Sequence, residues 1–256
     1  MRRALAILLL AAVPACAPEP PIADAAAPAP PPPPALAPVP ASASVSAVAV
    51  AVTSRPAEAS SSIRYLALGD SFTIGTGSSP AESFPARLAE RLRASGRAVV
   101  LENLGVNGFT TDDLLAREIP RVASFAPTLV TVAVGANDLV HGSPPDRYRA
   151  QVRRIFTAIA AAGVAPARVL ALPQPDWSLS PVAADFGEQR VIAEHIAAFN
   201  DILREEAAAA GARYVDLFPL MQRQARAGLI AGDGLHPAAR AYGEWAAELE
   251  RAEPPR

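Results

Sequence analysis

One serine, one aspartate and one histidine in this chain have the types and spacing that nucleophilic catalysis needs. Ser71 lies in the turn Gly69-Asp70-Ser71, and Asp233 and His236 lie three residues apart near the C-terminus. A serine hydroxyl becomes a good nucleophile when a base removes its proton, and histidine exchanges a proton near neutral pH. An aspartate three residues before the histidine can reach its other ring nitrogen and stabilise the imidazolium. These residues predict acyl transfer with Ser71 as nucleophile, His236 as base and Asp233 as its partner.

The composition restricts the other kinds of chemistry. The 256 residues carry a formal net charge of -2, so no excess of positive charge predicts a nucleic-acid partner. Apart from three histidines every basic residue is arginine, which excludes lysine Schiff bases and Walker-type phosphate sites. Cys16 is the only cysteine, which excludes an internal disulfide and a zinc–thiolate cluster. We expect His141 in a solvated loop, His195 on a helix face, and neither a metal nor a cofactor.

The first 16 residues are typical of an export signal. Arg2 and Arg3 form a positive start, residues 4–13 are apolar but too few to span a bilayer, and small residues precede Cys16. This arrangement resembles the lipobox of bacterial lipoproteins, in which the cysteine is lipidated after cleavage before it. The alternative is an ordinary signal peptide cut nearby. We therefore expect an exported protein of the cell envelope, anchored by lipid at Cys16 or otherwise secreted.

The next segment, residues 17–60, consists almost entirely of Ala, Pro, Ser and Val. Twelve of the chain's 27 prolines fall between Pro18 and Pro56. Proline lacks a backbone donor, and few large side chains are present to form a core. The composition predicts a disordered, partly polyproline tether that precedes one domain at residues 61–256.

Within this domain, short apolar runs alternate with longer helical patterns. The predicted strands are residues 63–68, 98–103, 129–134, 168–172 and 213–216, and the predicted helices are residues 83–95, 111–124, 145–162, 188–210 and 237–250. The alternation predicts an α/β fold with three layers, α/β/α, around one five-stranded parallel sheet. Ligands of such folds bind beyond the carboxyl ends of the strands, so residues that follow strands are the candidates for a site.

Four short motifs stand at those positions or in the final loop. They are Gly69-Asp70-Ser71, Asn103-Leu104-Gly105-Val106-Asn107-Gly108, Gly135-Ala136-Asn137-Asp138 and Asp233-Gly234-Leu235-His236. In type and order the motifs resemble the four blocks of the SGNH hydrolases, also called GDSL esterases and lipases, although Phe72 stands where the family name has leucine. The resemblance runs from residue 63 to the end of the last helix and implies the flavodoxin-like SGNH fold. The Gly-x-Ser-x-Gly motif of the α/β-hydrolases does not occur in the chain.

The resemblance also implies an oxyanion hole. Its donors would be the Ser71 and Gly105 backbone N–H groups and the Asn137 side-chain amide, aimed at the charge of a tetrahedral intermediate. Pro237 suits the first position of a helix, which would place His236 at the N-cap. Taken alone, Ser71 could instead serve only as a helix cap.

The long loop 173–187 follows the fourth predicted strand and carries two aromatic side chains, Trp177 and Phe186. Long loops in compact domains are often functional. We expect these aromatics to shape the acyl or alcohol pocket, and the alternative is a surface loop whose aromatics pack on the body of the domain.

The leading hypothesis is a metal-independent serine esterase. The family resemblance allows short-chain acyl esters, acetylated glycans and lysophospholipids as substrates, so the partner is a small-molecule, glycan or lipid ester. Two alternatives stay open at this point: a tethered binding lipoprotein without activity, and an acyltransferase that uses the same acyl-serine. Turnover of a simple ester distinguishes the first alternative, and product analysis with an added alcohol distinguishes the second.

Overall fold

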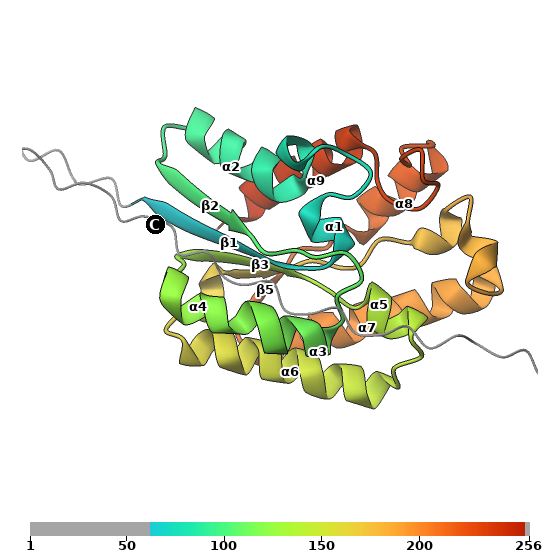
Figure 1. Cartoon of the computed structure of the whole chain (residues 1–256), viewed down its shortest axis with the longest axis horizontal. Helices are drawn as coiled ribbons and strands as arrows, with labels where there is room; N and C mark the ends of the chain where they lie inside the picture. Colours follow the sequence, from blue (N-terminus) through green and yellow to red (C-terminus); the bar gives the residue numbers. More distant parts are fainter. Residues whose placement is uncertain (1–61, 254–256) are drawn as a thin grey trace, which may run out of the picture. The chain divides into compact units, whose positions relative to one another are not determined.

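Five short strands form the parallel sheet at the centre of the domain. The computed structural model describes residues 62–253, so the predicted signal peptide, Cys16 and the whole of the predicted tether lie outside the described residues. The strands are β1 (Ile63–Gly69), β2 (Val99–Asn103), β3 (Leu129–Ala133), β4 (Val169–Ala171) and β5 (Arg213–Tyr214). Their order is β2-β1-β3-β4-β5, and all four neighbouring pairs are parallel. The predicted five-stranded parallel sheet is confirmed (Figure 1).

Both faces of the sheet are buried, because helices cover each of them. Along β1, Tyr65 and Ala67 join one apolar cluster and Leu66 and Leu68 join the other. The first cluster packs under α2 (Phe84–Ala94), α8 (Phe218–Arg226) and α9 (Ala239–Ala252), and the second under α4 (Ile119–Phe125), α6 (Pro145–Ala161) and most of α7 (Gln189–Ala209). Figure 1 shows these helices as the two outer layers, which confirms the three-layer α/β/α architecture.

The predicted helix at residues 111–124 is interrupted in the structure. It consists of α3 (Thr111–Asp113), a π-helical turn η2 (Leu114–Glu118) and α4. Pro120 explains the interruption, because it has no N–H to donate and its ring conflicts with the carbonyl four residues earlier. The chain adopts a wider turn in which the Ile119 N–H donates to Leu114 O.

Three further helices were not predicted. The turns α1 (Ser71–Ile74) and α5 (Ala136–Val140) are too short for a periodic pattern, while α8 has a polar residue on its buried face. That residue is Gln224, whose Oε1 accepts the Trp245 indole N–H at 2.8 Å. Short 3-10 turns complete the domain: η1 (Pro80–Glu82), η3 (Pro166–Arg168), η4 (Trp177–Leu179) and η5 (Ala183–Asp185).

The start of the last helix differs from the prediction. Helix α9 begins at Ala239 with Ala238 as its N-cap, so His236 is not at the N-cap. His236 instead lies in the bend before the helix, where Pro237 forms an isolated bridge with Ile230 and the His236 carbonyl accepts the Ala231 N–H at 2.7 Å. From this position the His236 ring contacts Ser71 and Phe72 of α1.

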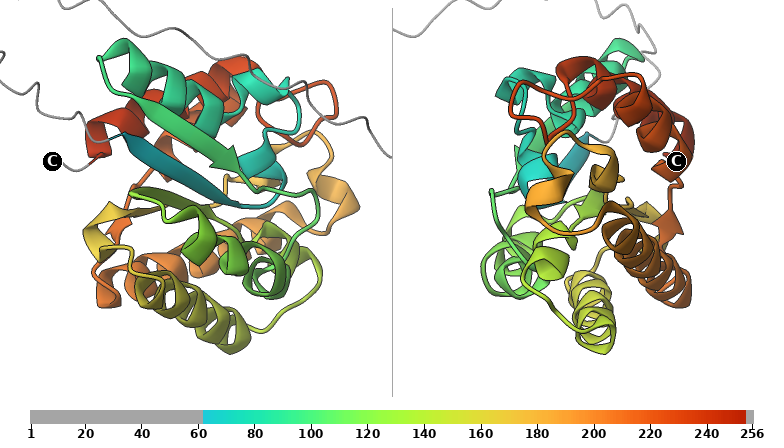
Figure 2. Two further views of the ribbon diagram at one scale, coloured as in Figure 1. Left: turned by 60° about the vertical axis from the view of Figure 1, so that its left-hand side comes forward. Right: turned by 90° about the vertical axis from the view of Figure 1, so that its right-hand side faces the viewer.

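The ends of β1 and β3 meet several loops on one side of the molecule. In Figures 1 and 2, α1, α5 and the η4–η5 segment lie at the same end of the sheet. Among residues 62–253, no helix is long and apolar enough to cross a bilayer.

Candidate active site

Ser71 lies at the junction of β1 and α1, where it is the first helical residue. The N-cap of α1 is Asp70, whose Oδ1 accepts the Phe72 N–H at 3.0 Å. The capping role therefore belongs to Asp70, and the Ser71 hydroxyl remains available for another partner. Within the described chain, the Ser71 N–H has no hydrogen-bond acceptor, as is usual in the first turn of a helix.

The backbone before Ser71 is tightly enclosed, and Gly69 is the residue that permits this. A Cβ atom on Gly69 would lie 2.1 Å from Ala133 O and 2.3 Å from Thr73 Oγ1. Gly69 also has a φ of 151°, a value that side chains rarely allow. A side chain at this position would displace the end of β1 from β3.

The structure brings the predicted nucleophile, base and acid together. The distance from His236 Nε2 to Ser71 Oγ is 2.9 Å, and the distance from His236 Nδ1 to Asp233 Oδ2 is 2.7 Å. The Phe72 ring lies beside the imidazole, with ring centroids 5.3 Å apart. With its proton on Nδ1, the imidazole donates to Asp233 and its Nε2 accepts the Ser71 O–H, which is the arrangement that general-base catalysis requires.

Asp233 is held as a carboxylate by the chain that follows it. Its Oδ1 accepts the Leu235 N–H at 2.9 Å and the His236 N–H at 3.0 Å. Partial burial raises the pKa of Asp233, but these two bonds and the His236 ring outweigh it, so the net pKa is lowered. The carboxylate is therefore charged at neutral pH and fixes the orientation of the ring.

The prediction that Gly105 provides an oxyanion donor is wrong. Its N–H donates to Asn103 Oδ1 at 3.1 Å, and a Cβ atom on Gly105 would lie 2.5 Å from the Ile74 nitrogen. Gly105 thus packs closely against the backbone of α1 and does not line the cavity around Ser71. Gly108, three residues later, lines that cavity, and its N–H has no acceptor among residues 62–253.

Asn137 lies in the cavity as predicted. Its Nδ2 donates one hydrogen to Phe109 O at 3.0 Å, which leaves the second hydrogen of the amide group for a ligand. Because Phe109 follows Gly108 directly, this bond also ties the Asn137 side chain to the loop after β2.

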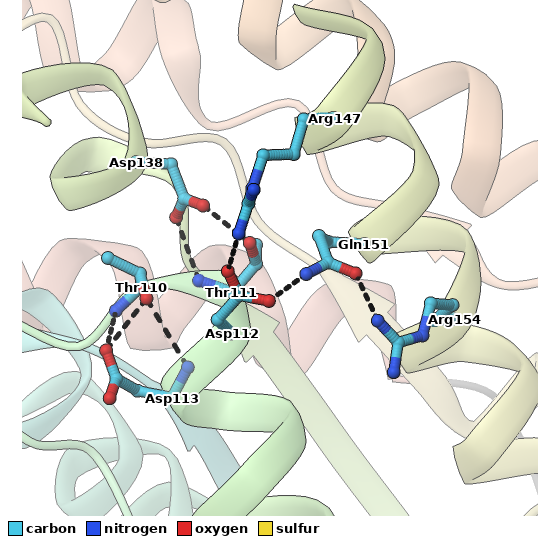
Figure 3. Close-up of polar contacts among 8 residues, drawn as sticks. All are labelled: Thr110, Thr111, Asp112, Asp113, Asp138, Arg147, Gln151 and Arg154. Carbon is cyan, nitrogen blue, oxygen red and sulfur yellow. Dashed lines mark hydrogen bonds and ion pairs between the residues drawn. The ribbon is translucent and has the colours of Figure 1, made fainter. Parts of the chain in front are cut away.

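A polar network joins the same loop to α5 and α6 (Figure 3). The buried Asp138 carboxylate accepts the Thr111 N–H at 2.9 Å and the Thr111 hydroxyl. Asp112 in turn accepts from Arg147 and Gln151 of α6. Thr110 is the N-cap of α3 and forms a capping box with Asp113. The loop that carries Gly108 is therefore fixed to the helix that carries Asn137.

A cavity of about 280 Å³ opens beside Ser71. It is lined by Ser71, Phe72, Thr76, Asn107, Gly108, Ala136, Asn137, Val140, Trp177, Phe186, Leu235 and His236. The two aromatics of the long loop thus lie where they were expected. Trp177 is 4% exposed, with its indole N–H donated to Gln174 at 3.1 Å, while Phe186 is 43% exposed and packs edge-on against Trp177.

The other two histidines lie outside this cavity. His141 is exposed where α5 ends, and His195 is exposed on α7. Both positions agree with the interpretation of the sequence.

Comparison with known proteins defines the class of this chain. Residues 67–243 match the GDSL-like Lipase/Acylhydrolase family. The chain therefore belongs to this family of ester-cleaving hydrolases. An arylesterase from Vibrio mimicus is 31% identical over 107 residues, which are 42% of this chain and 54% of that enzyme, so the match spans about half of the relative.

Solved structures show the same architecture. TesA is 25% identical with a TM-score of 0.61, and the match covers 74% of this chain and 97% of TesA. The acetylxylan esterase Axe2 from Geobacillus stearothermophilus is 18% identical with a TM-score of 0.61, and the match covers 76% of this chain and 95% of that one. This second likeness concerns the fold.

Some residues that line the cavity, or that hold its walls in place, were not predicted from the sequence. Gly108 was part of the second motif, but nothing in the motif distinguishes its N–H from that of Gly105. Asp138 could have been identified as a supporting residue. It follows Asn137 directly, and a carboxylate next to a site residue must be either solvated or hydrogen-bonded to a neighbour.

Proposed function

We propose that this protein is a serine esterase that hydrolyses carboxylic esters through an acyl-serine intermediate. The observation that carries the proposal is the continuous chain from Ser71 Oγ through the His236 ring to Asp233, with 2.9 Å and 2.7 Å between the heavy atoms. Membership of the GDSL-like Lipase/Acylhydrolase family supports the same reaction.

In the first half-reaction His236 Nε2 takes the hydroxyl proton as Ser71 Oγ bonds to the ester carbonyl carbon. The resulting imidazolium is stabilised by Asp233 and then gives its proton to the leaving alcohol oxygen as the carbon–oxygen bond breaks. In the second half-reaction a water molecule loses a proton to His236 and attacks the acyl-serine. Ser71 leaves with that proton, and the acid is released.

Three donors are available for the oxyanion that forms in each half-reaction. They are the Ser71 N–H, the Gly108 N–H and the second hydrogen of the Asn137 amide. All three residues line the cavity. Gly108 replaces Gly105 in this role because the Gly105 N–H is already donated to Asn103.

The cavity supports a small, uncharged ester as the substrate. Its walls are mainly apolar, and the described residues that line it include no Asp, Glu or Arg. A cavity of about 150 Å³ holds a benzene ring, so about 280 Å³ suits a short acyl group together with a compact or aromatic alcohol. Because no arginine is among the described residues that line the cavity, a phosphorylated headgroup would find no cationic side chain in its wall. We therefore favour aryl and short-chain acyl esters over lysophospholipids and acetylated glycans.

The test compares phenyl acetate, phenyl hexanoate, lysophosphatidylcholine and acetylated xylo-oligosaccharides as substrates of the wild-type chain and of Ser71→Ala. We expect the highest kcat/KM with a phenyl ester, and no turnover or fluorophosphonate labelling of Ser71→Ala. Full activity of Ser71→Ala would refute the nucleophile. A wild-type chain that neither turns over an ester nor reacts with the fluorophosphonate would favour the binding lipoprotein instead.

For the location of the protein, we propose export and lipid attachment at Cys16. Support comes from the sequence alone: the paired arginines, the short apolar stretch and the small residues before the cysteine. Expression in bacteria with labelled palmitate should label the wild-type chain and leave Cys16→Ser unlabelled. Equal labelling of both chains would exclude Cys16 as the site of attachment.

A further inference from the structure

A second carboxyl group lies beneath the turn that carries Ser71, outside the steps described above. Glu118 is the last residue of the π-helical turn η2 and is 2% exposed. Its Oε2 accepts the Gly69 N–H at 2.8 Å. Its Oε1 is buried and has no hydrogen-bond partner among residues 62–253.

Gly69 is the last residue of β1 and lies two positions before Ser71. Its carbonyl accepts the Val106 N–H at 3.3 Å, so the loop after β2 holds one side of this residue while Glu118 holds the other. Because no side chain fits at Gly69, these two bonds and the packing against Ala133 determine the direction in which the chain leaves the sheet.

Glu118 occupies a position where an apolar residue is expected. Leu114, Val122 and Phe125 bury the same face of this helical segment, and Glu118 falls between them at the spacing of that face. An apolar side chain at position 118 would leave the Gly69 N–H without a partner in the protein interior. Unpaired buried backbone groups are rare in native proteins because they are costly.

The charges that face Glu118 are acidic. Asp70 in the β1–α1 turn and Asp113 in α3 both act on Glu118 through the charge of their carboxylates. Burial raises the pKa of Glu118 to about 9, with these two carboxylates adding to the effect and the Gly69 N–H opposing it. At neutral pH the side chain is therefore an uncharged carboxylic acid, whose carbonyl oxygen accepts a hydrogen bond as a glutamine does.

We propose that Glu118 is a positioning residue for the nucleophile: its Oε2 holds the Gly69 N–H and thereby directs Ser71 Oγ toward His236. The inference rests on the proposed esterase function. It extends the site to a residue that contacts neither the substrate nor the reacting atoms.

The charge state has a consequence for stability. Glutamic acid in an unfolded chain has a pKa near 4.3, so between about pH 4.3 and pH 9 the folded state binds one proton more than the unfolded state. Stability therefore decreases as pH rises through this window. Glutamine at position 118 cannot ionise, so this part of the decrease should be absent from Glu118→Gln.

The experiment compares Glu118→Gln, Glu118→Leu and the matched control Val122→Ala with the full-length wild type. Val122 is buried on the same helical segment but makes no bond to Gly69. The measurements are kcat and KM for phenyl acetate at pH 7, the rate of fluorophosphonate labelling, and the melting temperature from pH 5 to pH 9. We expect Glu118→Leu to lose about tenfold or more in kcat and in labelling rate with KM within about twofold, because the nucleophile is misplaced.

Glu118→Gln should keep kcat within about threefold of wild type, and its melting temperature should exceed that of wild type increasingly toward pH 9. Val122→Ala should melt at a lower temperature and keep its kcat.

If Glu118→Leu folds and has the same kcat as the wild type, the inference is overturned. If Glu118→Leu does not fold, Glu118→Gln decides: a tenfold loss of kcat there would overturn the inference, and retained kcat with the shifted pH profile supports it. If the wild type is active and the variants at position 118 keep its kcat and labelling rate, only this inference is refuted. If the wild type itself is inactive, the esterase function is refuted as well.

Discussion

Asn137 differs from the other donors of the site because its side chain performs two tasks. One amide hydrogen is donated to Phe109 O, which leaves the other for a ligand in the cavity that Asn137 lines. In Asn137→Ala the oxyanion loses one of its three donors. The expected loss is about 2.7–4 kcal/mol of transition-state stabilisation, or roughly 10²–10³ in kcat, with little change in KM.

Asn107→Ala is the control for this substitution. Asn107 lines the same cavity, but its side chain accepts from the Thr76 hydroxyl and has no role in the proposed reaction. Steady-state kinetics with phenyl acetate should show nearly wild-type kcat for Asn107→Ala. Equal losses in the two variants would show that the amide of Asn137 only supports the wall of the cavity.

Residue types and spacing predicted most of this site. Ser71, Asp233 and His236 follow from what a serine nucleophile needs, and the structure places them within hydrogen-bond distance. The choice between Gly105 and Gly108 could not be made in the same way. Their N–H groups are chemically identical, and only the position of the Asn103 side chain in the folded chain occupies one of them.

At the scale of elements, Asp138 binds Thr111 and so joins helix α5 to the loop after β2 and to α3, which directly follows that loop. Thr111→Val keeps the shape of the side chain and removes the hydroxyl that donates to the buried carboxylate. The expected cost is about 1–3 kcal/mol of folding free energy. Since Gly108 lies on the same loop, kcat should decrease by up to about tenfold and KM should change less.

Thr110→Ala separates this effect from a general weakening of α3. Thr110 caps the helix with Asp113 and makes no bond to Asp138. Loss of the cap should cost about 1 kcal/mol without a comparable loss of kcat. Denaturant unfolding and steady-state kinetics on both variants provide the comparison, and similar kcat values for the two would contradict the proposed link between Asp138 and the loop.

Helices and strands with a clear apolar pattern were predicted, whereas local exceptions were not. The helix at residues 111–124 was expected to be continuous, and Pro120 was the available sign of its π-helical turn. Helix α8 was missed because Gln224 faces the core, where it binds Trp245. In both places a tertiary contact or a backbone conflict outweighed the local pattern.

At the scale of the whole molecule, the prediction that the motifs converge followed from the architecture. The carboxyl ends of parallel strands lie at one edge of a sheet, and the strand order places β1 between β2 and β3. The three motifs that follow these strands therefore had to be neighbours. The shape of the cavity could not be predicted, because it depends on how the η4–η5 segment packs against α7 and α8.

The position of Trp177 also allows binding in the cavity to be followed by tryptophan fluorescence. The chain has two tryptophans: Trp245 is on the buried face of α9, in the core, and Trp177 forms part of the cavity wall. Their indoles consequently report on different events. A molecule that enters the cavity changes the surroundings of one fluorophore, whereas loss of the fold exposes both, so the emission spectrum of the unlabelled protein can distinguish occupancy of the site from unfolding.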